Sequence, residues 1–145
     1  MKQPRYSQGQ TIVEAIVVVS VVVILMTGLV AATTASLKSA QSSRIRGVAT
    51  SQAEDGLEYV RSLRDESWDT FQSYSGEYCL NNEKVLTAGN AATCPNNIST
   101  TVGNFTRTIL FSWDGSKMTV TSKVDFLVGA ASTNVTLVTY FTNWR

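Results

Sequence analysis

The sequence predicts an α+β protein in which one long N-terminal helix packs on a small antiparallel sheet. The helix is expected to be apolar in its first half and amphipathic in its second half. Three patterns carry this prediction: an uncharged apolar run over residues 15–37, apolar positions at helical spacing over residues 37–63, and strand-like alternation in the last third. The 145 residues provide enough chain for about one domain.

The apolar run is long enough to cross a membrane. Its 23 residues, 15–37, contain no charged side chain, and a bilayer core of ~30 Å needs about 20 helical residues. A lone strand would leave its backbone groups unsatisfied in lipid, so the run is predicted to be helical. Lys2 and Arg5 precede it without an acid, which places the N-terminal end in the cytoplasm by the positive-inside rule.

The boundary before this run leaves three interpretations open. The segment could be a permanent single-span anchor, or a secretory signal cleaved near residues 31–36. The third interpretation starts from Glu14, since an ionisable group in a membrane segment costs up to a few kcal/mol unless it has a partner or lies at the interface. A cut between Gly9 and Gln10 would create an ammonium group about one helical turn from Glu14. Pairing of these charges, within or between subunits, would compensate both and fix axial register.

The residues at this boundary resemble a known signal. The letters SQG, followed by QTIVEA and the apolar run, are similar to the class III signal of type IV prepilins and pseudopilins. The resemblance implies cleavage after Gly9 by a prepilin peptidase, N-methylation of the new first residue Gln10, and a role for Glu14 in recruiting and registering the subunit. The family usually has Phe or Met where this chain has Gln10, and many members have a kinking Pro that this helix lacks.

The helix is predicted to continue to about Asp65. One face carries a stripe of apolar residues, and Gly28, Gly47 and Gly56 are its expected weak points. The letters AEDGLEYVR, residues 53–61, are similar to the helix end of PilV-type minor prepilins. The stripe consists of Leu37, Ala40, Ile45, Val48, Ala49, Ala53, Leu57, Val60 and Leu63.

Residues 66–104 are predicted to form a connecting loop region that contains both cysteines. Cys79 and Cys94 lie 15 positions apart, and a disulfide is the default expectation if this part of the chain is outside the cytoplasm. Two free thiols are the alternative. Trp68, Phe71, Tyr74 and Tyr78 are the expected aromatic anchors of this region.

Residues 105–145 are predicted to form an antiparallel sheet of three strands. The strands are expected at residues 105–113, 117–128 and 134–143, with a hairpin turn at Asp114-Gly115 and a loop over residues 129–133. The apolar face of this sheet needs a cover, which the amphipathic half of the helix can supply. The resulting division is a leader over residues 1–9, a membrane or filament helix over 10–37, an amphipathic helix over 38–65, the connection, and the sheet.

Composition argues against the common chemical functions. The chain has no His, 12 Lys and Arg, 11 Asp and Glu, and a net charge of +1. No metal site or cofactor is expected, and no nucleic-acid binding is expected from so small a net charge. No phosphate-binding glycine loop and no nucleophile with a credible base is present, so no enzyme is predicted.

The prediction is therefore a structural subunit of a type IV pilus or pseudopilus, most similar to a minor pilin. Its expected partners are the prepilin peptidase, other pilin subunits and the membrane. It would be a single-pass protein of the inner or cytoplasmic membrane, with its leader in the cytoplasm before processing and its place in an extracellular filament after assembly. The alternative is a single-span, membrane-anchored exported domain that binds a ligand or partner.

Overall fold

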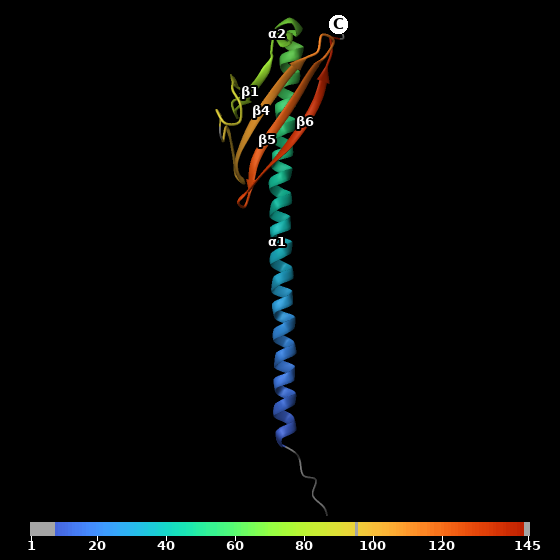
Figure 1. The fold of residues 1–145 in the computed structure, drawn as a ribbon, viewed down its shortest axis with the longest axis vertical. Helices are drawn as coiled ribbons and strands as arrows, with labels where there is room; N and C mark the ends of the chain where they lie inside the picture. The colour runs from blue at the N-terminus through green and yellow to red at the C-terminus, as the bar shows by residue number, and fades with distance from the viewer. Residues whose placement is uncertain (1–7, 95, 144–145) are drawn as a thin grey trace, which may run out of the picture. The chain divides into compact units, whose positions relative to one another are not determined.

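The computed structural model describes residues 8–94 and 96–143, which fall into two compact units within residues 1–41 and 42–145. The long helix α1 (Gln8–Glu66) contributes to both units. The predicted α+β arrangement of a long N-terminal apolar helix and a small antiparallel sheet is confirmed (Figure 1). The remaining elements all belong to the second unit. They are α2 (Trp68–Gln72), β1 (Gly76–Leu80), β2 (Leu86–Ala88), β3 (Ile98–Thr100), β4 (Gly103–Trp113), β5 (Met118–Val128) and β6 (Ala131–Phe141).

The second unit contains the hydrophobic core, which lies between the C-terminal part of α1 and one face of the sheet. Ala49, Ala53 and Val60 on the helix are completely buried. They meet inward-facing residues of β4 and β5, including Ile109 and Val124. The predicted stripe is thus confirmed from Ile45 onward. Leu37 and Ala40 were expected on the same stripe but are exposed, and both belong to the first unit, whose described residues are helical throughout.

The sheet is antiparallel throughout, in the order β2-β1-β4-β5-β6, with β3 paired to β4. Strand β5 alternates between buried and half-buried positions over most of its length, as the sequence pattern predicted. The third predicted strand was expected from residue 134, but β6 begins at Ala131. The earlier start follows from a tight turn: Val128 pairs with Ala131, and Gly129 adopts a φ of +64° that glycine accepts without strain.

The connection over residues 66–104 has more structure than a loop region. It contains α2, β1, β2 and β3. Ser67 caps α2 by accepting a hydrogen bond from the Thr70 backbone, and Phe71 on α2 is completely buried. Alternation is hard to detect in strands of three to five residues, but β1 and β3 gain their backbone partners from β4.

Gly56 lies where the helix packs closely against the sheet. A β-carbon placed there would lie 3.0 Å from Ser122 Oγ, 3.1 Å from Ile109 Cδ1 and 3.2 Å from Arg107 Cδ. Gly47, one of the other predicted weak points, has open space around its α-carbon, with nothing within 4 Å of such a β-carbon. The two helical glycines therefore differ in function: one permits packing, whereas the other only weakens the helix.

The Gly56→Leu substitution is expected to destabilise the second unit by about 1–3 kcal/mol or more, because the added atoms overpack the contact between helix and sheet. The matched Gly47→Leu substitution should stabilise it by up to about 1 kcal/mol, through helix propensity alone. Urea unfolding of the full chain in detergent micelles, followed by tryptophan near-ultraviolet circular dichroism, measures both changes. Equal effects of the two substitutions would contradict the role assigned to Gly56.

Candidate functional site

The first unit offers a continuous apolar surface. The described part of α1 includes a stretch long and apolar enough to cross a membrane, and none of its most apolar 18-residue window is buried. Exposure of the large side chains ranges from 41% at Val22 to 70% at Leu37. A helix with an apolar surface on all sides is stable in a bilayer or among other apolar helices, but not in water.

Four of the polar side chains within this apolar stretch bond to their own helix. Ser20 Oγ donates to the Ile16 carbonyl at 2.8 Å, and Thr27 Oγ1 donates to the Ile24 carbonyl at 2.9 Å. Thr33 and Thr34 make equivalent bonds further along. Such bonds leave these hydroxyl groups with a partner where water is absent. The surface of this stretch is therefore apolar in effect, despite its Ser and Thr content.

Glu14 is the only charged residue between positions 12 and 37. It is exposed on α1, and the structure gives it no ion pair among the residues described. Gly9 and Gln10, the predicted cleavage and methylation positions, fall in the first turn of α1. Their side-chain surroundings lie outside the described part, as do residues 1–7 of the predicted leader. One helical turn separates Gln10 from Glu14.

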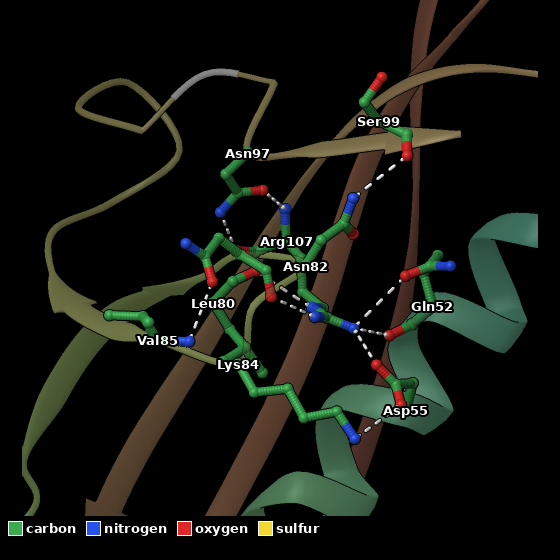
Figure 2. A network of polar contacts seen from close by, with 10 residues as sticks. Gln52, Asp55, Leu80, Asn82, Lys84, Val85, Asn97, Ser99 and Arg107 are labelled. Carbon is green, nitrogen blue, oxygen red and sulfur yellow. Dashed lines mark hydrogen bonds and ion pairs between the residues drawn. The ribbon is translucent and has the colours of Figure 1, made fainter. Parts of the chain in front are cut away.

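The second unit contains a buried polar network that the sequence analysis missed. Arg107 on β4 is completely buried, and its guanidinium group points toward α1 (Figure 2). Its Nη1 donates to the Gln52 carbonyl at 2.8 Å and to Asp55 Oδ2 at 2.9 Å. Its Nε and Nη2 donate to the carbonyl groups of Leu80 and Asn81, at 3.2 and 3.0 Å. One side chain thus joins the helix, the end of β1 and β4.

The backbone of Arg107 is held as firmly as its side chain. Asn97 Oδ1 accepts from the Arg107 amide at 2.7 Å, and Asn97 Nδ2 donates to the Arg107 carbonyl at 2.8 Å (Figure 2). Lys84 Nζ lies 3.5 Å from Asp55 Oδ1, so a second cation reaches the same carboxylate. A signal for this network was present in the sequence, because Arg107 is the only charge in the predicted strand over residues 105–113.

The network changes the acidity of both partners. For Asp55, burial raises the pKa, but the hydrogen bond and positive charge of Arg107, together with Lys84, lower it more, so the net pKa lies below its ordinary value. For Arg107, burial lowers the pKa below its ordinary value, while Asp55 opposes that change. Asp55 is therefore expected to be ionised at neutral pH. The buried Arg107 makes the arrangement a structural link between α1, the end of β1 and β4.

The two cysteines form a disulfide between the end of β1 and the loop before β3. The Cα atoms of Cys79 and Cys94 lie 6.2 Å apart, so the predicted pairing is confirmed. Gly89 packs beside the bridge, where a β-carbon would lie 2.5 Å from Thr93 Oγ1 and 3.2 Å from Cys94 Sγ. The disulfide and the close packing at Gly89 stabilise this loop, which has little regular secondary structure.

The double substitution Cys79→Ser and Cys94→Ser is expected to destabilise the second unit by about 3 kcal/mol, because the unfolded chain regains the freedom of a loop of about 15 residues. Urea unfolding of the full chain in micelles, with and without the substitutions, measures the change. Wild-type chain treated with a reductant serves as a control and should unfold at the same urea concentration as the double variant. Unchanged unfolding in both samples would contradict the contribution assigned to the bridge.

No group of three or more metal-ligating side chains occurs in the part of the chain that the structure describes. Comparison with protein-family models, with curated proteins and with solved structures gave no match. Functional inference therefore rests on the chain's own residues. The two features that need an explanation are the unburied apolar stretch with its single carboxylate and the disulfide-stabilised sheet unit that follows it.

Proposed function

We propose that this chain is a minor pilin-like structural subunit of a type IV pilus or a type II secretion pseudopilus. A prepilin peptidase cleaves it after Gly9, and the apolar stretch of α1 then leaves the bilayer and packs with the helices of other subunits. The second unit is displayed outside the cell on the filament. The observation that carries the proposal is Glu14, a lone charge at the start of a 23-residue uncharged stretch, five positions after Gly9.

The exposed apolar side chains support this proposal. A helix that is apolar on all sides can exchange lipid contacts for contacts with similar helices at little cost in hydrophobic energy. The uncharged surface itself does not select one axial position over another. A carboxylate that finds a cation on a neighbouring helix selects one register, because other registers leave it unpaired in an apolar medium.

The disulfide of the second unit supports the inference that this part of the chain is exported. A disulfide persists in oxidising compartments and is rare in the cytoplasm, so the Cys79–Cys94 bridge favours an extracytoplasmic place for residues 42–145. A bridge-stabilised sheet unit joined to an apolar helix fits a displayed domain. The same features fit a permanently anchored exported domain, so processing is the decisive experiment.

Mass spectrometry of the protein recovered from its native membrane is expected to show a mature chain that starts at Gln10, methylated or not. The Gly9→Ala substitution should block this processing and leave the full-length precursor, because the peptidase is expected to require glycine at that position. Gly28→Ala is the matched control, since it changes a glycine of the same helix that has open space around it and lies far from the cut.

The outcomes separate the alternatives. A chain that starts at Met1 in the wild type would contradict the proposal and favour the anchored exported domain. A start near residue 36 would indicate a secretory signal and would also contradict it. Loss of the Gln10 start in both Gly9→Ala and Gly28→Ala would show that the effect is not specific to the cleavage position.

A further inference from the structure

The stretch of α1 that follows the apolar segment is positively charged and has no acid nearby in the sequence. Residues 15–53 contain three cations, Lys38, Arg44 and Arg46, and no Asp or Glu. Arg44 and Arg46 belong to the second unit and are exposed, and no carboxylate partner is recorded for either within the described residues. Other arginines of the same helix do have one: Arg61 pairs with Glu58, and Arg64 with Asp65.

Ile45, which lies between these two arginines in the sequence, lines a cleft together with apolar residues at one end of the sheet. The cleft is bordered by Val102, before β4, and by Leu127, near the end of β5. Leu127 is 64% exposed, and the turn that follows it to β6 is uncharged. The turn lies at the end of the sheet where α1 enters the second unit (Figure 1). This end therefore combines two cations with the exposed Leu127 and the half-buried Val102.

The cleft also contains one acid, whose charge is already compensated. Asp125 Oδ1 forms an ion pair with Lys123 Nζ at 2.9 Å, and the side chain of Asp125 is 23% exposed. The net charge contributed by Arg44, Arg46 and this pair is positive. An anionic surface is consequently attracted to this end of the unit rather than repelled.

The position of the arginines along the chain determines which surface they meet. Arg44 lies seven positions along α1 after Leu37, the last residue of the uncharged stretch. At the helical rise these positions span about 10 Å. Side chains on a helix lean toward its N-terminus. The headgroup layer on one side of a bilayer is roughly 5–8 Å thick, and an arginine can extend its charged end into it.

We propose that Arg44, Arg46, Val102 and Leu127 form a basic rim that rests on anionic lipid headgroups while the apolar segment is in the membrane. The arginines bind headgroup phosphates, and Val102 and Leu127 lie beside them at the level of the headgroups. The rim holds the sheet unit close to the bilayer before assembly. This inference requires a membrane-inserted helix, which both the pilin and the anchor interpretations include, but it requires neither cleavage nor a filament.

A spin label at Ala130 tests this proposal in the full, unprocessed chain. Ala130 is exposed in the turn between β5 and β6, and a matched label at Ser116 lies in the exposed turn between β4 and β5. The chain is reconstituted in vesicles of phosphatidylcholine alone or mixed with phosphatidylglycerol. Accessibility to oxygen, which partitions into lipid, is compared with accessibility to a water-soluble nickel complex.

The Ala130 label is expected to be accessible to oxygen and protected from nickel in the anionic vesicles, while the Ser116 label stays in water. Arg44→Gln with Arg46→Gln should return the Ala130 label to water, since each arginine is expected to contribute about fivefold to affinity for an anionic surface. Arg61→Gln with Lys117→Gln, which removes two charges elsewhere, should leave the Ala130 label in place.

Two results would overturn the proposal. Equal exposure of the Ala130 and Ser116 labels to nickel in both kinds of vesicle would show that the rim does not contact lipid. Equal lipid contact with and without phosphatidylglycerol, retained in the double Gln variant, would show an apolar contact without recognition of anionic headgroups. Neither result bears on processing at Gly9, so failure of this inference remains distinguishable from failure of the proposed function.

Discussion

The Glu14→Gln variant is expected to be cleaved after Gly9 as efficiently as the wild type, yet to be nearly absent from extracellular filaments. Gln keeps the size of the side chain and removes only its charge. In the proposed assembly this leaves the cationic partner of Glu14 alone in an apolar contact. Breaking a buried ion pair in this way costs about 3–5 kcal/mol, which corresponds to at least about a hundredfold loss of affinity between neighbouring subunits.

The measurement compares immunoblots of the sheared extracellular fraction and of the membrane fraction for each variant. Glu54→Gln is the matched control, because Glu54 is an exposed glutamate on the same helix but in the second unit. Wild-type membrane levels of Glu14→Gln would exclude a folding defect. Filament recovery that is unchanged by Glu14→Gln would exclude a role for this carboxylate in register and would favour the anchored exported domain.

The Arg107→Met variant is expected to destabilise the second unit by about 3–5 kcal/mol, because Met supplies the apolar stem but none of the donors. The carbonyl groups of Leu80 and Asn81 lose their side-chain donors, and Asp55 loses the closer of its two cations. For a unit of about 100 residues, each kcal/mol corresponds to about 4–8 °C in melting temperature. Thermal unfolding of the full chain in micelles should therefore begin at least about 10 °C lower.

Arg61→Met is the control for this substitution. Arg61 is an exposed arginine paired with Glu58 on the same helix, and surface pairs of this kind contribute about 0–1 kcal/mol. The variant should melt within a few degrees of the wild type. Equal melting of Arg61→Met and Arg107→Met would show that the buried network does not hold the helix, β1 and β4 together.

The Asp55→Asn variant tests the electrostatic part of the same network. Because the pKa of Asp55 is lowered in the folded chain, its ionised form stabilises the fold above the ordinary Asp pKa of about 3.9. That contribution is lost as the pH falls through the lower pKa of the folded state. The wild type should lose stability below about pH 4, and Asp55→Asn should show a smaller loss over the same range.

Much of the fold was predictable because local sequence patterns determine it. The uncharged run over residues 15–37, the helical spacing up to Leu63 and the alternation in β5 each require only neighbouring residues to be recognised. The disulfide followed from the presence of two cysteines in a chain expected to be exported. The short strands β1, β2 and β3 were missed because three to five residues carry too little pattern. Strand β1 also takes backbone partners from β4, which is distant in sequence.

By itself, the sequence determined which segments of the chain are apolar, which are charged, and that Glu14 is a single charge at the start of the apolar run. These are properties of composition and spacing. Only the tertiary structure decided that Arg107 is buried against Asp55, 52 positions away, and that Gly56 is needed for close packing rather than being a weak point of the helix. Both results depend on which residues the sheet places opposite α1. Such contacts are set by strand register and packing distance, which no local pattern encodes.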